Sequence, residues 1–280
     1  MSFLKPFFKT MREGRRLVNS PGRPATALAC RTLLAVLLFG WAGGAGARCR
    51  LPILVYHRFA ATAADSMTVR TDRFAAQLDY LAGHGYTVVP LRQAVACLRG
   101  EPVALPPRAL AITVDDGHRS VYTDMLPLVR RRLIPVTLFI YPSAISNASY
   151  ALTWEQLAEL RASGLFDVQS HSYWHPNFRQ EQRRLTPEQY QTLVRMQLEK
   201  SRSVIAAHVG APVDLLAWPF GIHDADLMAR AAAAGYRAAF TLERRSASDT
   251  DDPMALPRYL MVDALDLAGF ARLLQAGSGS

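Results

Sequence analysis

One stretch of the chain reads Ala109-Leu110-Ala111-Ile112-Thr113-Val114-Asp115-Asp116-Gly117-His118. Its first six residues are apolar or β-branched and follow two prolines, so they predict a short buried strand. Asp115 and Asp116 come next, side by side, and Gly117 permits a backbone turn that other residues resist. Two carboxylates at the end of a buried strand are costly unless one binds a cation and the other handles a proton. A solvated turn is the alternative for this stretch taken alone.

The composition is that of an ordinary globular protein, with 50% of the 280 residues hydrophobic and 20% charged. This length suffices for one large domain or two small ones. The formal net charge of +9 is unevenly spread, because residues 1–47 hold seven lysines and arginines and one acid, which leaves +3 for the rest. The basic excess therefore belongs mainly to the N-terminal arm, and we expect no nucleic-acid binding by the folded part.

The N-terminal arm has the pattern of an export signal. A basic stretch ends at Arg31, residues 32–42 are mainly apolar, and small residues at 45–47 match a cleavage site. The apolar run is shorter than the roughly 20 residues that span a membrane. We therefore predict a secretory signal that is removed near Arg48, with an uncleaved membrane anchor as the alternative. Either outcome places the folded part in the periplasm or outside the cell.

Three cysteines bear on the redox compartment. Cys30 lies in the signal, so Cys49 and Cys97 remain in the exported part. These two could form a disulfide in an oxidising compartment, although sequence spacing alone does not establish the geometry. The sequence contains no Cys-x-x-Cys motif, which argues against a zinc site built from thiolates.

Beyond the signal, strand-like and helix-like patterns alternate. The expected strands are residues 52–57, 86–89, 109–114, 136–140, 166–170, 215–218 and 238–241. The expected helices are residues 71–84, 91–98, 122–133, 154–163, 187–208 and 224–234. This order predicts βα units around a mostly parallel sheet, either open or closed into a barrel. We assign residues 1–47 to the arm and signal, residues 48–276 to a single α/β domain and residues 277–280 to a flexible tail.

Polar residues follow several of these strands, which is where sites form in parallel α/β folds. His57, the pair Asp115 and Asp116, and His171 all stand at predicted strand ends. One helical turn after the last of these strands would bring His175 beside His171. Two imidazoles and one carboxylate, with a position left for water, describe a catalytic zinc-type site. Histidines in ordinary loop or core positions are the alternative, but the coincidence of both motifs at strand ends favours a metal.

Three segments resemble, in order, the motifs of the polysaccharide deacetylase family, which is also called the NodB-homology family or carbohydrate esterase family 4. They are Thr113-Val114-Asp115-Asp116-Gly117, Ser170-His171-Ser172-x-x-His175 and Trp218-Pro219-Phe220-Gly221. The segment Ile53-Leu54-x-Tyr56-His57 resembles the branch that contains poly-β-1,6-N-acetylglucosamine deacetylases. The resemblance covers residues 51–262. It implies a distorted (β/α) barrel of the NodB-homology type with fewer than eight complete units.

The resemblance also implies roles for individual residues. Asp116, His171 and His175 match the ligands of a divalent metal, usually Zn²⁺, and Asp115 matches the general base. Such a metal polarises the acetyl carbonyl and acidifies a bound water, from which the base takes a proton. The resulting oxyanion needs donors, and the backbone N–H of Phe220 matches the donor that the family uses beside the metal.

Two positions depart from the family pattern. Ala217 stands where many members carry an arginine that orients the base, and Arg258 is our candidate substitute, with a surface arginine as the alternative. The late Leu-x-His motif, which usually supplies the general acid, is missing. We assign the acid to His57, with a structural histidine below the site as the alternative. His118 and His223 are weaker candidates for residues that line the site.

Aromatic residues in or beside the motifs suit a sugar ligand, because sugar rings present C–H faces that pack on aromatic rings. They are Tyr56, Tyr173, Trp174, Trp218 and Phe220. A place in the packed core is the alternative for Trp218 and Phe220, and for Trp218 it is the better interpretation.

These features predict an exported, metal-dependent enzyme that removes N-acetyl groups from hexosamine units of a polysaccharide. Poly-N-acetylglucosamine is the leading substrate, and peptidoglycan, chitin-type chains and O-acetylated polysaccharides are alternatives. A non-catalytic sugar-binding or export-scaffold protein on the same fold is the alternative from another class. The presence of Asp115 argues against it, because a purely structural metal site has no need of a second acid. The expected partners are the acetylated polysaccharide and an exopolysaccharide export machinery, with membrane association if the N-terminal segment is retained.

Overall fold

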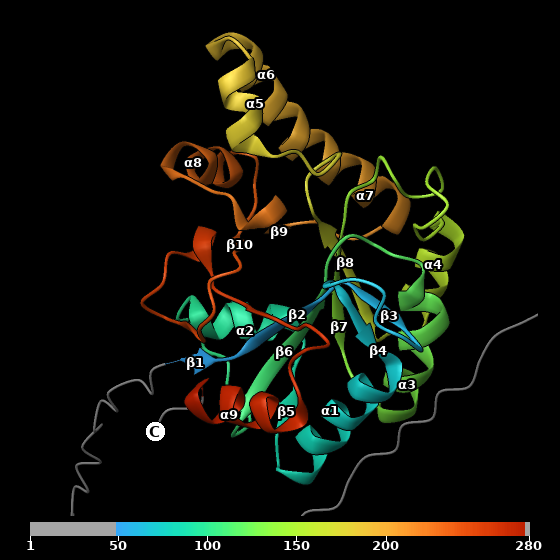
Figure 1. Ribbon diagram of the computed structural model, residues 1–280. Helices are drawn as coiled ribbons and strands as arrows, with labels where there is room; N and C mark the ends of the chain where they lie inside the picture. The colour runs from blue at the N-terminus through green and yellow to red at the C-terminus, as the bar shows by residue number, and fades with distance from the viewer. Residues whose placement is uncertain (1–48, 278–280) are drawn as a thin grey trace, which may run out of the picture. The chain divides into compact units, whose positions relative to one another are not determined.

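A parallel β-sheet organises residues 49–277, which are the residues that the computed structural model describes. Its strands are β2 (Ile53–Tyr56), β5 (Thr87–Val88), β6 (Ala109–Val114), β7 (Val136–Ile140), β8 (Phe166–Ser170), β9 (Leu215–Ala217), β10 (Ala238–Phe240) and β12 (Tyr259–Leu260). They lie in the order β10-β9-β8-β7-β6-β2-β12, and β5 pairs with the start of β6 (Figure 1). Each of these pairings is parallel. The carboxyl ends of neighbouring strands therefore meet at one edge of the sheet.

Helices connect most of these strands. They are α1 (Thr71–Gly83), α2 (Leu91–Leu98), α3 (Leu126–Arg132), α4 (Trp154–Ala162), α5 (Phe178–Arg184), α6 (Pro187–Arg195), α7 (Ser201–Val209), α8 (Ala225–Ala233) and α9 (Leu267–Gly277). Short π-helical turns, Val121–Met125 and Met196–Lys200, lead into α3 and α7. Two further strand pairings are antiparallel β1 (Arg50–Leu51) with β11 (Ala247–Ser248) and parallel β3 (Arg58–Ala60) with β4 (Thr68–Arg70).

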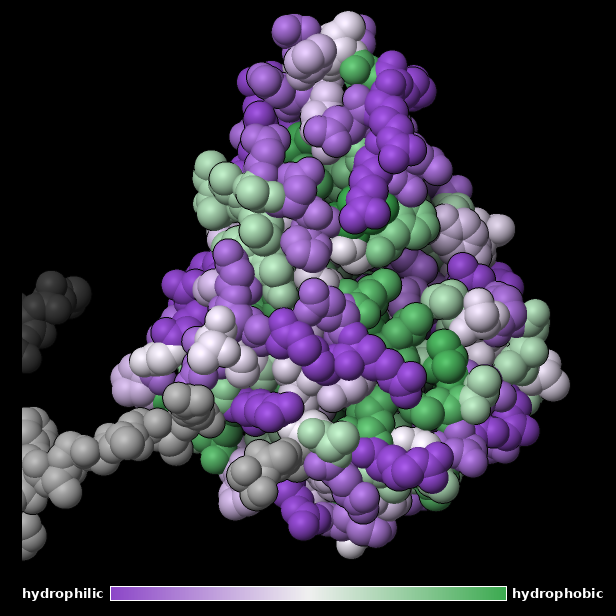
Figure 2. Space-filling model, turned by 60° about the vertical axis from the view of Figure 1, so that its left-hand side comes forward, coloured by the Kyte–Doolittle hydropathy of each residue, from purple (hydrophilic) through white to green (hydrophobic). Residues whose placement is uncertain are grey.

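The alternation that the sequence predicts is confirmed, because every predicted strand and helix is present. The predicted helix over residues 187–208 runs through α6 and α7 with a π-helical turn between them. Sequence analysis missed two helices, α5 and α9. Helix α5 packs beside α6 at one end of the described domain (Figure 1). Figure 2 shows that this end is mostly hydrophilic, and the exposed residues Arg179, Arg183 and Arg184 of α5 explain why it carries little apolar periodicity.

Alternate residues of the strands face two separate apolar clusters, as the two-residue period of a strand requires. The larger cluster contains Leu54 and Ile112, together with the apolar faces of most helices. The smaller cluster contains Ala111, Phe139 and Phe240, and it extends from the start of the sheet toward its carboxyl ends. Phe139 and Phe240 of the smaller cluster pack against Arg258, which belongs to the site described below.

One segment near the C-terminus bonds to β10 at one end of the strand order and, through β12, to β2 at the other. The Leu256 N–H donates to the Ala239 carbonyl oxygen at 2.8 Å, and the Thr241 N–H donates to the Leu256 carbonyl oxygen at 2.8 Å. A few residues further on, β12 pairs with β2 at the opposite end of the strand order. The sheet is therefore a parallel half-barrel whose two ends are bridged by this segment, which confirms the predicted distorted (β/α) barrel. Arg258 lies within the bridge.

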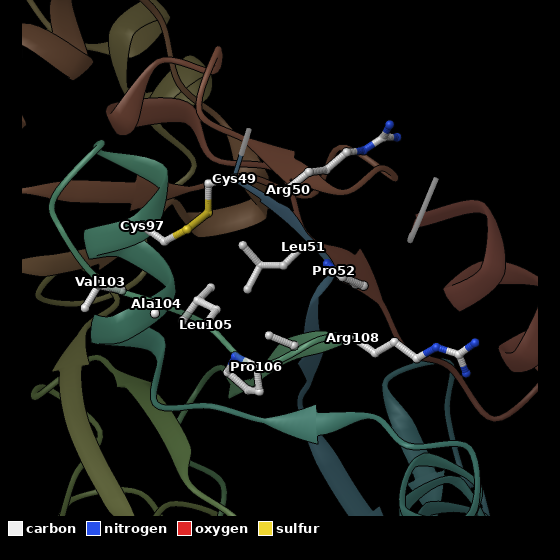
Figure 3. Close-up of a pocket in the computed structure, with 11 residues that line it drawn as sticks. Cys49, Arg50, Leu51, Pro52, Cys97, Val103, Ala104, Leu105, Pro106 and Arg108 are labelled. Carbon is white, nitrogen blue, oxygen red and sulfur yellow. A yellow bond between two sulfur atoms is a disulfide. The ribbon is translucent and has the colours of Figure 1, made fainter. Parts of the chain in front are cut away.

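A disulfide joins Cys49, just before β1, to Cys97 in α2. Figure 3 shows it beside a pocket of about 530 Å³ at the amino ends of β2 and β6. The lining of this pocket is largely apolar, with the arginines Arg50 and Arg108 but no carboxylate or imidazole. The disulfide forms the pairing that sequence analysis left open, and such bonds are typical of oxidising compartments.

Within residues 49–277, no helix is long and apolar enough to cross a membrane. The predicted signal or anchor in residues 1–47, with its cleavage near Arg48, lies outside the described residues, as do residues 278–280. The domain boundaries that we assigned from the sequence stay predictions.

Candidate active site

The carboxyl ends of the strands surround a pocket of about 480 Å³. Its lining includes His57, Asp115, Asp116, His171, His175 and Phe220. All six were singled out by sequence analysis, and they follow strands β2, β6, β8 and β9. The parallel sheet brings them together because their strands end at the same edge. Arg258 lies directly behind Asp115.

Asp116, His171 and His175 lie close enough together to hold one metal ion. One potential ligand atom of each lies within 4.8 Å of the other two. Oδ1 of Asp116 is 3.6 Å from Nε2 of His171 and 3.8 Å from Nε2 of His175. Nδ1 of His171 donates to the carbonyl oxygen of Ala217 at 2.8 Å, so Nε2 is the nitrogen left to bind a metal. Two imidazoles and one carboxylate suit a divalent ion such as Zn²⁺.

The electrostatic surroundings favour the neutral form of one of these imidazoles. Burial, followed by the neighbouring His171, lowers the pKa of His175 to about 4. The ring of His175 is therefore neutral near pH 7, which is the form in which histidine binds a metal.

The loop that carries His175 is held in an uncommon backbone conformation. His175 has a φ of 65°, a value that non-glycine residues adopt only when their surroundings stabilise it. Asp116, in the loop after β6, has a similar φ of 73°. Part of that support comes from the buried Gln197, whose Oε1 accepts the N–H groups of Tyr173 and Trp174 at 3.0 Å each. Gln197 lies in the π-helical turn before α7, and such turns are frequent at functional sites.

Asp115 and Arg258 form a buried ion pair behind the metal candidates. Nη1 and Nη2 of Arg258 donate to Oδ1 and Oδ2 of Asp115 at 2.8 and 2.7 Å. Burial works to raise the pKa of Asp115, but Arg258 and then His171 outweigh it and lower the pKa to about 2. The carboxylate is therefore ionised at any physiological pH, and the paired hydrogen bonds fix its plane.

Arg258 is itself held from several sides. Its Nε donates to the carbonyl oxygen of Thr241 at 3.1 Å, and Nη1 donates to Oγ1 of Thr113 at 3.1 Å. Its guanidinium carbon lies 5.5 and 5.8 Å from the ring centroids of Phe139 and Phe240. The alternative of a surface arginine is wrong, because Arg258 is fully buried. Its position suits an arginine that orients the base, and that role stays a prediction.

His57 lines the same pocket and is only 9% exposed. Its Nδ1 has no hydrogen-bond partner among residues 49–277. Burial lowers the pKa of His57, and the carboxylates of Asp115 and Asp116 oppose this effect. A buried ring nitrogen without a partner is uncommon in folded proteins. The role of general acid that we assigned to His57 stays a prediction.

Two of the aromatic residues belong to the core. Tyr56 and Trp218 are fully buried. The Tyr56 hydroxyl donates to Oε1 of Gln77 at 2.8 Å, and Nε1 of Trp218 donates to the Met254 carbonyl oxygen at 2.9 Å. The expectation that Tyr56 contacts a sugar is wrong, because its side chain points away from the pocket face on which His57 lies. The place of Trp218 in the core is confirmed, and Trp218 also contributes to the lining of the pocket.

The other aromatic residues lie nearer to solvent. Trp174 is 43% exposed and Phe220 is 57% exposed. Phe220 lies in the turn Pro219–Gly221 after β9, with a φ of 56°, and its ring centroid is 4.5 Å from that of His175. Tyr173 is half-buried and contacts the Lys200 ammonium group. The role of the Phe220 N–H as an oxyanion donor stays a prediction.

Sequence reasoning missed two polar residues of the pocket, Arg58 and Tyr141. Tyr141 directly follows β7, so the rule applied to the other strand ends could have found it. Arg58 directly follows His57, which was assigned to the site. Neither His118 nor His223 is among the described residues that line this pocket.

Comparisons with known proteins agree with the resemblance noted in the sequence. Residues 103–239 match the model of the family described as polysaccharide deacetylase. The chain is 25% identical to the poly-β-1,6-N-acetyl-D-glucosamine N-deacetylase of Escherichia coli K12, over 78% of this chain but only 37% of that protein. It is 22% identical to the protein of the same name from Staphylococcus epidermidis, over 69% of this chain and 68% of that protein.

Solved structures show the same fold. IcaB from Ammonifex degensii is 25% identical, with a TM-score of 0.69, over 82% of this chain and 97% of that chain. The deacetylase PplD from Streptococcus pyogenes, solved in complex with acetate, is 20% identical, with a TM-score of 0.72, over 82% of this chain and 99% of that chain. Because the identity to PplD is only 20%, this similarity shows a shared fold and no more.

Proposed function

We propose, from the match of residues 103–239 to the polysaccharide deacetylase model and from the site above, that this chain is a metal-dependent enzyme that hydrolyses the N-acetyl groups of a poly-N-acetylglucosamine-like polysaccharide. One observation carries the proposal: a buried carboxylate fixed by an arginine lies beside a three-residue metal site in a single pocket. A protein that only binds sugar or metal has no use for the second acid, Asp115.

Asp116, His171 and His175 would hold the divalent ion. These three ligands leave coordination positions for water and substrate, as catalytic zinc sites require. When bound, such an ion polarises the acetyl carbonyl and makes a bound water more acidic.

Asp115 is suited to take the proton from the attacking water. Its carboxylate is ionised, and Arg258 fixes its orientation before any substrate arrives. A pKa near 2 makes Asp115 a weak base by itself. The water that it deprotonates must therefore be more acidic than bulk water.

Two further groups are assigned to the later steps. Attack of the water on the acetyl carbonyl carbon creates an oxyanion, toward which the Phe220 N–H is the candidate donor. Breakage of the C–N bond then requires a proton on the leaving amine, and His57 is the candidate donor of that proton. The products are acetate and a hexosamine residue with a free amine.

We expect His57→Ala to lose about 10²- to 10³-fold in kcat, the range typical of a general acid, while its zinc content stays at the wild-type level. The reason is that His57 lies in the pocket but is not one of the three residues grouped as metal ligands. Acetate release and metal analysis on the same preparation check both parts. Wild-type turnover in this variant would remove His57 from the acid role, and loss of zinc would point to a structural role.

The choice of polysaccharide is supported by relatives and by the pocket. Two curated relatives are named poly-β-1,6-N-acetyl-D-glucosamine N-deacetylases. The exposed ring of Phe220 belongs to the pocket lining, and the exposed Trp174 directly precedes His175 in the chain. Such rings suit a ligand with apolar C–H faces.

We also propose that the enzyme acts after export, with the acetylated polysaccharide and an exopolysaccharide export machinery as partners. The basic arm, the apolar run and the small residues that follow support an export signal. The disulfide between Cys49 and Cys97 supports an oxidising compartment. Cell fractionation combined with N-terminal sequencing would separate a cleaved signal from a retained membrane anchor.

The test of the proposed function is acetate release from soluble β-1,6- and β-1,4-linked N-acetylglucosamine oligomers. The protein is first stripped with a chelator and then reloaded with Zn²⁺. We expect no release without metal, recovery with zinc and faster release from the β-1,6-linked oligomers. Preference for β-1,4 linkages would redirect the assignment to peptidoglycan or chitin-type chains. Stoichiometric zinc without release from either oligomer would favour an O-acetylated substrate or a binding protein.

A further inference from the structure

Four side chains beside the metal candidates take no part in the hydrolysis described above. They are Arg58, His118, Tyr141 and Tyr150, and we call them the tyrosine wall. Arg58 and Tyr141 line the pocket itself. The hydroxyl oxygens of Tyr141 and Tyr150 are 2.8 Å apart, and the rings of Tyr150 and His118 are stacked with centroids 6.3 Å apart. The wall thus leads from the pocket to the surface, where Tyr150 is 43% exposed.

Backbone hydrogen bonds hold Tyr150 in place. Its carbonyl oxygen accepts the Arg119 N–H at 2.8 Å, and the N–H of Leu152 donates to the carbonyl oxygen of Gly117 at 2.9 Å. The loop between β7 and α4 is thereby fastened to the segment that directly follows the two carboxylates after β6. An exposed aromatic ring that is already fixed loses little conformational entropy when it binds a ligand.

The order of the strands places the tyrosine wall on one side of the metal candidates. β8, which leads to His175, lies between β7 and β9. Tyr141 follows β7, and its ring centroid is 5.5 Å from that of His175. Phe220 follows β9, and its ring centroid is 4.5 Å from that of His175. A polymer with one acetyl group at the metal site therefore has a neighbouring sugar residue within reach of the wall.

We propose that the tyrosine wall is a subsite for the sugar residue next to the one being deacetylated, and that it selects a neighbour that still carries its acetyl group. This inference rests on the proposed function. The Tyr150 ring packs against the C–H face of the neighbouring sugar. The Tyr141 hydroxyl and an N–H of Arg58 bond its hydroxyl and acetyl oxygens.

Arg58 supplies the selectivity for an acetylated neighbour. Its Nη1 bonds Asp65 at 2.9 Å, and its Nε–H is buried without a hydrogen-bond partner among residues 49–277. Asp65 also accepts the Met67 N–H and the Thr68 hydroxyl at 2.9 Å each, so the turn between β3 and β4 holds the guanidinium in place. Arg58 lines the pocket whereas its partner Asp65 does not, so the cationic end of this ion pair is the end nearer to a neighbouring sugar. It repels the protonated amine of a deacetylated neighbour and leaves an uncharged N-acetyl neighbour undisturbed.

The first experiment measures the binding of N-acetylglucosamine monomer, dimer and tetramer to the metal-free protein by titration calorimetry. Wild-type affinity should rise with length. In Tyr150→Ala the gain in affinity from monomer to tetramer should shrink by roughly fivefold to tenfold, the size expected for one aromatic contact. Tyr150→Phe should keep most of the gain. Leu133→Ala, which truncates an exposed side chain outside the pocket, is the control and should match the wild type.

The second experiment compares kcat/KM of the zinc-loaded enzyme on two matched oligomers, one fully acetylated and one with a free amine next to the target residue. At a pH where the amine is protonated, the wild type should prefer the fully acetylated oligomer. Arg58→Gln should reduce that preference by roughly threefold to fivefold, Arg58→Lys should retain it, and added salt should weaken it in the wild type.

The outcomes separate this inference from the proposed function. In one outcome the wild type releases acetate while Tyr150→Ala shows the same dependence of affinity on oligomer length as the wild type. This result would overturn the subsite and leave the proposed function standing. Equal preference in wild type and Arg58→Gln would overturn the charge selection. A wild type that neither binds nor deacetylates these oligomers would overturn both the subsite and the choice of substrate.

Discussion

Asp115→Asn should lose at least about 10³-fold in kcat while it still binds Zn²⁺ stoichiometrically. Asparagine has nearly the same shape and keeps one oxygen for Arg258, but it cannot take a proton from water. The three candidate metal ligands are unchanged in this variant. Acetate release from zinc-loaded protein measures the loss of turnover, and metal analysis of the same sample measures the retained binding.

The matched control for this variant is Asp167→Asn. Asp167 also pairs with an arginine, since its Oδ2 lies 2.9 Å from Nε of Arg92, but it lies outside the pocket. We expect its kcat to equal that of the wild type. Full turnover in Asp115→Asn would mean that another group is the base. Loss of zinc together with turnover would place Asp115 among the metal ligands instead.

The strand-end residues could be predicted from the sequence because a parallel sheet brings the residues that follow its strands to one edge. Each of His57, Asp115 and His171 stands at the end of a segment predicted as a strand, and parallel strands end at one edge. The same logic, applied more strictly, would have placed Tyr56 correctly. Successive side chains of a strand face opposite sides, so a His57 in the pocket requires Tyr56 to point into the core.

The position of Arg258 could not be derived in this way. Arg258 stands between Pro257 and the apolar residues 259–262, of which only Tyr259–Leu260 form a strand, β12, so it does not follow a predicted strand as the other site residues do. The segment takes its place through hydrogen bonds to strands that are distant in sequence, such as that of the Leu256 N–H to β10. Only the resemblance to a family, with Ala217 in place of its arginine, made Arg258 a candidate.

Tyr150 carries no sequence signal of a site for a related reason. It lies in an irregular loop, and its relation to the pocket depends on the bond between its hydroxyl and that of Tyr141. Neither periodicity nor spacing encodes a contact between a loop residue and a strand end. Metal ligands and bases could be predicted because their chemistry restricts the residue type, whereas an aromatic surface that binds sugar looks like any exposed aromatic residue.

Arg258→Met should lower the free energy of unfolding by about 3–5 kcal/mol at pH 7, because it leaves the buried charge of Asp115 without a partner. Methionine fills a similar volume among Phe139 and Phe240, so lost packing contributes little. The freed carboxylate also loses its fixed orientation, and kcat should fall by roughly 10²-fold. Denaturant unfolding of the metal-free protein measures the first effect, and acetate release measures the second.

The pH dependence of this destabilisation gives an independent check. In the wild type the pKa of Asp115 is depressed to about 2, so its contribution to stability is complete above the ordinary pKa of about 4 and is lost as pH falls through 2. Without Arg258, burial becomes the dominant effect and raises the pKa of Asp115 above its ordinary value. Protonation then relieves the buried charge. The stability difference between wild type and Arg258→Met should therefore shrink as pH is lowered from 7 toward 5.

The double variant Asp115→Asn with Arg258→Met distinguishes a buried charge from a merely structural contact. Removing both partners of a buried pair is often close to neutral, so the double variant should be more stable than Arg258→Met alone. Its turnover should nevertheless stay as low as that of Asp115→Asn, because no base remains. A double variant as unstable as the sum of the two single variants would show that the contacts of Arg258 with Thr113 and Thr241, rather than the charge pair, hold this part of the barrel together.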